Sequence, residues 1–207
     1  MITIIDTGIA NVASIKNMIY RCGSEAEIAA SPKDAENASK IILPGVGAFD
    51  AGMDKIIENG WNDFLDDYVL RDNKIILGIC LGMHFLTHSS EEGNRKGLSY
   101  IDAETIRFDK NTLQKNQKVP HMGWNEITRL KKSNLFNDLE SEERFYFVHS
   151  YHVNCNDAED ILTTTDYGNN FHSAFKKDNI IGVQFHPEKS HRFGVDFFKN
   201  FITLKDD

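Results

Sequence analysis

One cysteine in this sequence lies in a setting that suits a nucleophile. Cys80 is the centre of the Gly-Ile-Cys-Leu-Gly sequence at residues 78–82, which follows an apolar run at 75–77 and leads into an apolar stretch at 81–86. A buried strand, a sharp turn flanked by glycines and a helix form a nucleophile elbow, and the helix dipole favours a thiolate there. The alternative is a buried structural cysteine at a strand end, which is common, but the flanking glycines favour the nucleophile.

A thiolate nucleophile needs a base, and the base needs a group that orients it. His186 is the most suggestive of the eight histidines, because Gly-Val-Gln-Phe-His-Pro-Glu at residues 182–188 ends a predicted strand. Side chains two apart in an extended segment project to the same side, so Glu188 can accept from one ring nitrogen while the other faces a thiol. On its own the motif fits a polar strand end about equally well. Together with the elbow it predicts a triad of Cys80, His186 and Glu188.

Two further segments offer groups to a substrate. Pro-Gly-Val-Gly at residues 44–47 ends a predicted strand, and its glycines allow the backbone to turn N–H groups toward an oxyanion. A plain strand-to-helix turn needs the same residue types, and that alternative stays open. His-Ser-Tyr-His at residues 149–152 lies in an aromatic strand, where it either lines a substrate pocket or packs across strands.

Metal and nucleotide chemistry have weaker support in the sequence. His84 and His88 are four residues apart on a predicted helix, which is the spacing of a zinc pair. There is no glutamate directly after the first histidine and no clear third ligand, so we predict no metal site. The sequence also lacks Gly-x-Gly-x-x-Gly and P-loop motifs, and we therefore expect no cofactor.

The elements that position these groups change in character along the chain. The first half alternates strands with helices, which predicts a parallel sheet with right-handed crossovers. The second half is rich in strands, with a hairpin turn at Asp178–Asn179 and a closing helix. We therefore predict one α/β domain over residues 1–207, a three-layer sandwich with a mostly parallel central sheet and an antiparallel extension. Strands are predicted at residues 1–5, 26–30, 41–43, 75–77, 103–108, 125–129, 145–154, 161–166, 171–176 and 180–185, and helices at 11–20, from 31, from 49, and at 61–70, 81–86 and 193–204.

Composition narrows the class of protein. The chain has 31 acidic and 23 basic residues and a formal net charge of −8, which argues against a nucleic-acid binder. It contains no run of eighteen apolar residues, so we expect no membrane span. The N-terminal residues 1–6 are typical of a first strand and not of a signal peptide. Three cysteines without framework spacing favour a reduced, cytoplasmic protein.

With these segments together, the chain resembles the class I glutamine amidotransferases, and within them the glutaminase subunits of imidazole glycerol phosphate synthases. The resemblance covers about residues 1–204. It implies the fold of that family. The motif at 120–125 is much more specific to the synthase branch than the first and last motifs, which many amidotransferases share. The matching motifs are Leu-Pro-Gly-Val-Gly-Ala-Phe at 43–49, Pro-His-Met-Gly-Trp-Asn at 120–125, Phe-Tyr-Phe-Val-His-Ser-Tyr at 145–151 and Gly-Val-Gln-Phe-His-Pro-Glu-Lys-Ser at 182–190.

The resemblance implies a reaction and a set of roles. Cys80 attacks the carboxamide of L-glutamine, forms a glutamyl thioester and releases ammonia, while His186 moves the proton and Glu188 orients it. The ammonia passes to a separate (β/α)₈ cyclase subunit in a heterodimer, which makes imidazole glycerol phosphate and AICAR in histidine biosynthesis. The implied oxyanion hole uses the N–H of Leu81 and, after a peptide rearrangement, an N–H of Val46 or Gly47, and the implied substrate contacts are Gly45, His84, His149, Ser150 and Tyr151.

Three positions depart from the family's pattern. His84 stands four residues after the nucleophile, where the family carries a glutamine that contacts the substrate; a neutral imidazole is shorter and offers one donor and one acceptor. Thr7 and Ala10 replace a tyrosine and a glycine in the first loop, and alanine is strained there if the position needs a positive φ. These departures fit a non-catalytic regulatory subunit of the same fold as one alternative.

A second alternative concerns the acceptor of the ammonia. Residues 188–194 resemble a paralogous branch that supplies ammonia for amidination of a surface-polysaccharide sugar. The sequence leaves both acceptors open.

Overall fold

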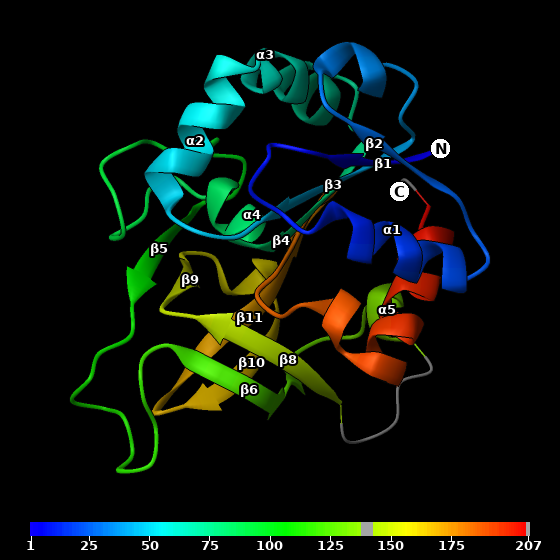
Figure 1. Cartoon of the computed structure of the whole chain (residues 1–207). Helices are drawn as coiled ribbons and strands as arrows, with labels where there is room; N and C mark the ends of the chain where they lie inside the picture. The colour runs from blue at the N-terminus through cyan, green and yellow to red at the C-terminus, as the bar shows by residue number, and fades with distance from the viewer. Residues whose placement is uncertain (138–142, 206–207) are drawn as a thin grey trace.

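The computed structural model describes residues 1–137 and 143–205 (Figure 1). A large mixed sheet runs through the centre, and helices cover both of its faces (Figure 1). This is the three-layer α/β sandwich that the sequence predicts. In the described ranges, no helix is both long enough and apolar enough to cross a membrane.

Parallel strands form one half of the sheet, in the order β2-β1-β3-β4-β12. β1, β3, β4 and β12 are buried almost throughout, as expected of apolar strands that are covered on both faces. β4 lies between β3 and β12 and pairs in parallel with both, so the carboxyl ends of these three strands meet at one edge. The bounds are β1 Ile2–Ile5, β2 Ala26–Ala29, β3 Lys40–Gly45, β4 Ile75–Cys80 and β12 Ile180–Val183.

Antiparallel strands continue the sheet beyond β12. β11 pairs with β12, β10 follows, and β7 lies at the end of this path, while β9 joins β11 to β5. A separate antiparallel pair is formed by β6 and β8. The sequence prediction of an antiparallel extension is confirmed. The bounds are β5 Ala103–Arg107, β6 His121–Glu126, β7 Thr128–Arg129, β8 Arg144–His149, β9 Tyr151–Cys155, β10 Ile161–Tyr167 and β11 Asn169–Lys177.

The helices divide between two hydrophobic clusters. α1 and α5 pack on one face, with apolar side chains at helical spacing such as Ile15 and Ile19 of α1 and Phe197 and Phe201 of α5. α2, α3 and α4 contribute to the cluster on the other face, which includes Trp61. The bounds are α1 Val12–Arg21, α2 Phe49–Glu58, α3 Trp61–Leu65, α4 Leu81–Phe85 and α5 His191–Thr203, with short turns η1 Pro32–Ala35, η2 Asp66–Arg71, η3 Asn134–Phe136, η4 Ala158–Asp160 and η5 Pro187–Lys189.

Several predicted bounds are wrong where the chain changes partner. The strand predicted over residues 145–154 is two strands, because β8 pairs with β6 whereas β9 pairs with β5 and β11. The strand predicted over 125–129 is also two, since β6 ends at Glu126 and β7 begins at Thr128 in another sheet. The helix predicted over 61–70 becomes π-helical in η2. Apolar patterns report burial and not pairing partners, so they run through such breaks.

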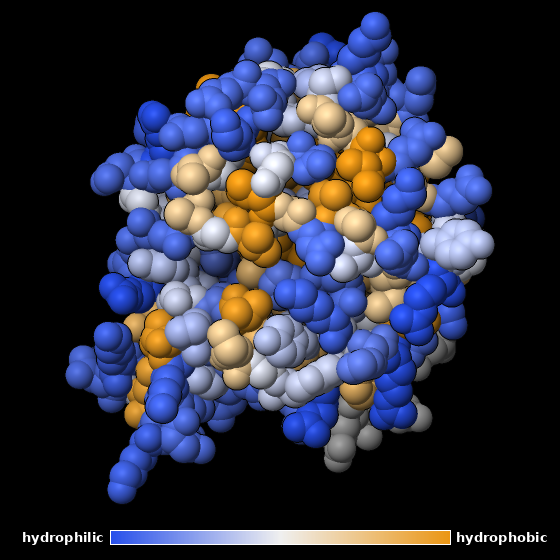
Figure 2. All heavy atoms as spheres, in the orientation of Figure 1, coloured by the Kyte–Doolittle hydropathy of each residue, from blue (hydrophilic) through white to orange (hydrophobic). Residues whose placement is uncertain are grey.

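The exposed apolar side chains are unevenly distributed. Most of the face seen in Figure 2 is hydrophilic, and apolar side chains gather near its middle. Met122 and Trp124 of β6 are 62% and 40% exposed, and Val46, just after β3, is 43% exposed. Val46 lines the same cavity as Pro120, which directly precedes β6. Exposed apolar groups around one site mark a candidate protein interface.

Candidate active site

The predicted nucleophile elbow is present between β4 and α4. Cys80 has φ +54° and ψ −111°, a conformation that costs free energy for a residue with a side chain. A β-carbon at Gly78 would lie 2.6 Å from the carbonyl oxygen of Gly82, and one at Gly82 would lie 1.8 Å from the carbonyl oxygen of Leu43. Only glycine fits at both positions, because the turn packs backbone against backbone.

The sheet register brings the other predicted segments to this elbow. Gly45 at the end of β3 is the register partner of Cys80, and Val183 at the end of β12 is the partner of Ile79. Residues that follow Val183 therefore leave the sheet beside Cys80. This arrangement brings residue 186 near residue 80, although they are far apart in the sequence.

His186 and Glu188 are in contact, but not through the extended backbone that the sequence predicts. The Nδ1 atom of His186 lies 2.8 Å from Oε1 of Glu188, and both side chains are buried. Pro187 begins the 3₁₀ turn η5, which carries Glu188 back toward the ring. The hydroxyl of Ser190 donates to the His186 carbonyl and thereby fastens this turn.

The charges around His186 favour its protonated form. Burial acts to lower the pKa of His186, but the neighbouring Cys80 and Glu188 outweigh burial and raise the pKa to about 10. The ring is thus a cation at neutral pH when Cys80 is a thiolate. A thiolate beside a protonated imidazole has the chemistry needed for a nucleophile with its proton donor.

A cavity of about 290 Å³ opens at the elbow. It brings together segments from both halves of the chain, as expected for a site at the carboxyl ends of parallel strands. Gly45 and Glu188 lie beside it and line a smaller neighbouring cavity. The predicted site residues that line the 290 Å³ cavity are Val46, Gly47, Cys80, Leu81, His84, His149, Ser150, Tyr151 and His186.

The sequence prediction missed Glu92, Pro120 and Val148, which also line the cavity. Glu92 accepts a hydrogen bond from the backbone N–H of Phe49, and burial raises the pKa of its carboxyl. It belongs to the polar segment of residues 89–97, which is typical of a surface loop. A carboxylate in such a loop has no local signal that it turns inward.

In the predicted oxyanion segment, the backbone N–H of Val46 does not point into the cavity. The backbone N–H of Val46 donates to the carbonyl oxygen of Ile9 at 3.0 Å, so it is not available to an oxyanion in this state. Gly47 has φ +98°, which only glycine adopts without strain, and Leu81 begins α4 directly after the nucleophile. An oxyanion contact from Val46 requires the rearrangement of its peptide.

Ala10 in the first loop would be strained if its backbone had a positive φ, and the structure shows that it does not. Gly8 has φ +77°, whereas Ala10 is not among the residues with a positive φ. Thr7 is buried, and its hydroxyl has no hydrogen-bond partner among the described residues. The alanine is therefore accommodated by this loop.

The other histidines that line the cavity, His84 and His149, are buried and neutral. Burial lowers the pKa of His84 to about 4, and its Nε2 atom lies 2.8 Å from Oε1 of Gln184. Burial also lowers the pKa of His149 well below its ordinary value, and its ring bonds to His121 and to the Tyr151 carbonyl.

The zinc pair considered from the sequence does not form. His88 lies beyond the end of α4 and bonds to Asp102 at 3.1 Å, while His84 faces Gln184. The two rings therefore have separate partners and do not share a ligand position.

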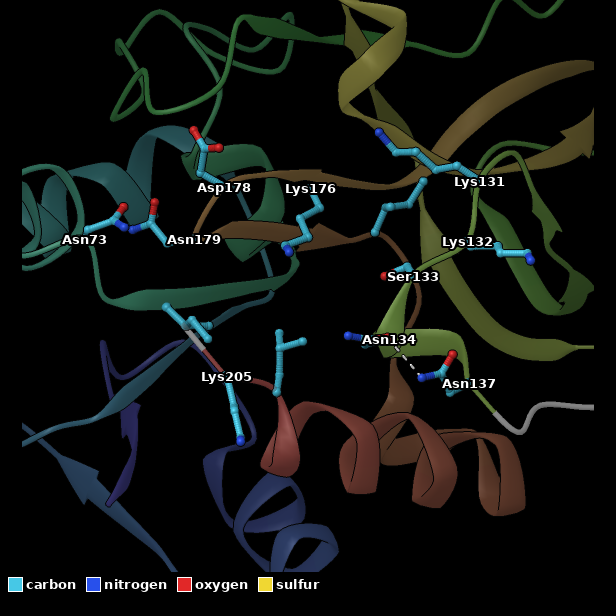
Figure 3. Close-up of a pocket in the computed structure, with 13 residues that line it drawn as sticks. Asn73, Lys131, Lys132, Ser133, Asn134, Asn137, Lys176, Asp178, Asn179 and Lys205 are labelled. Atoms are coloured by element: carbon cyan, nitrogen blue, oxygen red, sulfur yellow. Dashed lines mark hydrogen bonds between the residues drawn. The ribbon is translucent and has the colours of Figure 1, made fainter. Parts of the chain in front are cut away.

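A larger cavity, of about 790 Å³, lies away from the elbow (Figure 3). Ile75, at the opposite end of β4 from Cys80, lines it. Its lysines come from different segments, and Lys131, Lys132 and Lys205 point in different directions (Figure 3). These side chains do not converge on one point as catalytic groups must.

The fold and the site together are those of a class of enzyme: an α/β sandwich with a cysteine at a strained strand-to-helix turn and a buried histidine–carboxylate pair at the carboxyl edge of its parallel strands. The chain belongs to the class I glutamine amidotransferase family, whose sequence profile matches residues 3–204.

Curated relatives match along almost the whole chain. A relative from Methanococcus maripaludis named imidazole glycerol phosphate synthase subunit HisH 2 is 53% identical over 202 residues, covering 98% of each chain. The subunit HisH 2 of the same synthase from Pseudomonas aeruginosa is 45% identical, covering 99% of this chain and 100% of the relative. Among solved structures, a putative GMP synthase subunit from Thermoplasma acidophilum has a TM-score of 0.73 at 22% identity, covering 97% of this chain and 91% of the other. That likeness supports the fold.

Proposed function

We propose that this chain is the glutaminase subunit of an imidazole glycerol phosphate synthase, one domain over residues 1–207 that hydrolyses L-glutamine to glutamate and ammonia. The observation that carries the proposal is the buried contact of His186 with Glu188 next to Cys80, which stands at a strained elbow in a cavity. The names of the relatives support histidine biosynthesis over amidination of a polysaccharide sugar. The buried triad argues against a non-catalytic subunit, since such a cluster is costly to keep without chemistry.

The proposed reaction proceeds in two half-reactions. The Cys80 thiolate attacks the side-chain carboxamide carbon of glutamine, and the His186 imidazolium gives its proton to the departing nitrogen, which leaves as ammonia. The product is a glutamyl thioester on Cys80. Water then attacks the thioester carbon, His186 takes a proton from that water, and glutamate leaves as the thiolate forms again. Glu188 holds the Nδ1 side of the ring throughout.

The cavity lining supports a binding mode for an amino acid. The Glu92 carboxylate is an anionic side chain that can pair with the α-ammonium of glutamine. His149, Ser150 and Tyr151 line the same cavity and are proposed to contact the remainder of the substrate, next to Gly45. We propose that the N–H of Leu81, with one from Val46 or Gly47 after the peptide turns, stabilises the oxyanion.

The proposed partner is a separate (β/α)₈ cyclase subunit, in a heterodimer to which the ammonia is delivered. The exposed side chains of Met122 and Trp124, with Val46 at the cavity, suit a protein contact beside the site. We propose a cytoplasmic location, in keeping with cysteines that form no disulfide: Cys22, Cys80 and Cys155.

The test is a Cys80→Ala substitution, assayed for glutamate release from glutamine with the cyclase subunit present. Turnover should fall by at least about 10³-fold, since the nucleophile is lost. A Cys22→Ala variant is the matched control, because the Cys22 thiol bonds to the Val195 carbonyl on the α1–α5 side. Unchanged turnover in Cys80→Ala would refute the proposal, as would an unaltered complex that releases no glutamate.

A further inference from the structure

Gln184 is a buried amide beside the nucleophile to which the proposed reaction assigns no role. It directly follows β12, and the parallel register that pairs Val183 with Ile79 brings it level with Cys80. Its side chain is fully buried, and its backbone N–H donates to the Ser173 carbonyl. The backbone is thus held by the sheet while the carboxamide faces the site.

The two ends of the Gln184 carboxamide contact two site residues. Its Nε2 atom lies 3.8 Å from the Cys80 sulfur, and its Oε1 atom lies 2.8 Å from Nε2 of His84. A thiolate only accepts hydrogen bonds, so the amide must turn its NH₂ toward the sulfur. The amide oxygen then faces His84, and the ring must carry its proton on Nε2 to complete the bond.

This choice of tautomer leaves Nδ1 of His84 as a bare acceptor. The ring stays neutral at physiological pH, because burial lowers its pKa to about 4. The residue lines the 290 Å³ cavity, and its buried Nδ1 atom has no hydrogen-bond partner among the described residues. A buried acceptor without a donor is costly, and a ligand in the cavity with an N–H group removes that cost.

We propose that Gln184 is a positioning residue that donates to the Cys80 thiolate, accepts from His84 and thereby fixes the His84 tautomer that offers Nδ1 to an N–H of the substrate. The part that concerns the substrate rests on the proposed function. The part that concerns the thiolate does not, since it involves only groups of this chain.

The other ionisable groups around the sulfur have distinct effects. His186 from the segment after β12 supplies the positive charge, and Glu188 balances it from η5. His149 at the end of β8 is held neutral by burial, and Glu92 lines the same cavity. Gln184 therefore supplies a neutral donor that does not depend on pH.

The experiment measures alkylation of Cys80 by iodoacetamide as a function of pH, without substrate, by mass spectrometry of the Cys80 peptide. Gln184→Met keeps the size of the side chain but removes the donor. It should slow alkylation at neutral pH by about threefold to tenfold and move the profile to higher pH, since a charge-assisted hydrogen bond to the thiolate is lost. Gln114→Met, the same change at a glutamine outside the site, is the matched control.

A second variant keeps the test decisive if Gln184→Met does not fold. Gln184→Glu retains the shape and the acceptor for His84, but it cannot donate when ionised and repels a thiolate. Its alkylation should be slower than that of Gln184→Met. A merely structural role predicts little effect from this close isostere, so an unchanged alkylation profile in the folded variants overturns the proposal.

Two further readouts separate the parts of the proposal. Nitrogen-15 spectra of histidine-labelled protein should show His84 with its proton on Nε2, and Gln184→Met should abolish that preference. In the complex with the cyclase subunit, Gln184→Met should lower kcat for glutamine hydrolysis. If the unaltered complex hydrolyses no glutamine, the proposed function fails, while the alkylation profiles still decide the role of Gln184.

Discussion

Two cavities in the described part of this protein lie at opposite ends of β4 and differ in how their lining side chains are arranged. The larger one, about 790 Å³, is lined by lysines that point in different directions (Figure 3). The smaller one, about 290 Å³, is lined by Cys80 and His186 together with neutral buried histidines. Positive φ angles do not separate the two, since Cys80 at the smaller cavity has φ +54° while Asn73 and Asp178 at the larger one have φ +52° and +49°.

This contrast shows that volume by itself does not identify a catalytic site. Catalysis needs groups that converge, that are held by neighbours and that are withdrawn from water. At the carboxyl edge of the sheet, His186 meets these conditions because Glu188 holds its ring and burial excludes solvent. Substitutions at the two ends of β4 should therefore differ sharply in their effects.

The largest effect among the following predictions is expected from Glu188→Gln. Glutamine hydrolysis should fall roughly 10²-fold, because the ring loses the group that orients it. The pKa of His186 should fall below about 10, because one of the two groups that raise it is removed, while Cys80, which raises it more, remains. The measurements are kcat with the cyclase subunit present and an NMR titration of the histidines.

Glu188→Gln should also lower the free energy of unfolding, by an amount that depends on pH. A raised histidine pKa stabilises the folded protein fully below about pH 6.5, and that contribution is lost as the pH rises to about 10. Glu188→Gln should therefore be less stable than the unaltered protein at neutral pH, with a smaller difference near pH 10. The exposed Glu159→Gln is the control, and equal losses in the two variants would contradict the assignment.

The elbow itself is tested by Gly82→Ala. The added β-carbon would lie 1.8 Å from the carbonyl oxygen of Leu43 in β3, so β3 and α4 must move apart. We expect a loss of about 3 kcal/mol in the free energy of unfolding, measured by urea denaturation. Gly60→Ala is the comparison, since this glycine has φ +72° with open space around it and should lose only about 1–2 kcal/mol. An equal loss would argue against close packing at the elbow.

A smaller effect is expected from the buried neutral histidine of the cavity. His84 has a pKa of about 4 in the folded protein and 6.5 ordinarily, so the unfolded chain binds the proton first as the pH falls. Stability should drop between pH 6.5 and pH 4, and His84 should account for about 2 kcal/mol of the drop. The variant His84→Gln, which does not titrate, should show a shallower decline in unfolding free energy. Identical slopes would show that His84 is not buried as a neutral ring.

The smallest effect should come from the lysine-lined cavity. Lys132→Ala should change the free energy of unfolding by no more than about 0.5 kcal/mol, as is usual for an exposed side chain. Glutamine hydrolysis in the complex should be unchanged. A clear loss of activity in this variant would remove the contrast between the two cavities.

Much of the fold was predictable because the strands and helices carry local signals. The apolar run at 75–77, the glycines around Cys80 and the helical spacing of Ile15 and Ile19 act over a few residues, and each predicted the element that is present. The break at Ser150 was not predictable in this way. It depends on β8 and β9 finding partners in different sheets, which no local pattern encodes.

The candidate site shows the same division. Cys80, His186 and Glu188 stand in short motifs, so their types and spacing pointed to one another before any fold was known. Glu92 and Gln184 did not stand out, since one lies in a polar loop and the other in an apolar strand end. Both residues become candidates only through their surroundings in the fold, since Glu92 lines the cavity and Gln184 contacts Cys80 and His84.

The sequence by itself therefore determined the elbow, the identity of the triad candidates and the layered α/β class, because these depend on side-chain type and short-range periodicity. Only the tertiary structure decided that Glu188 reaches His186 through a 3₁₀ turn, that the Val46 N–H bonds to Ile9, and that Gln184 lies between His84 and Cys80. Those contacts follow from strand register and chain reversal across long sequence separations. Hydrogen bonds over 2.8 to 3.8 Å are sensitive to such placement, whereas the formation of a strand or a helix is not.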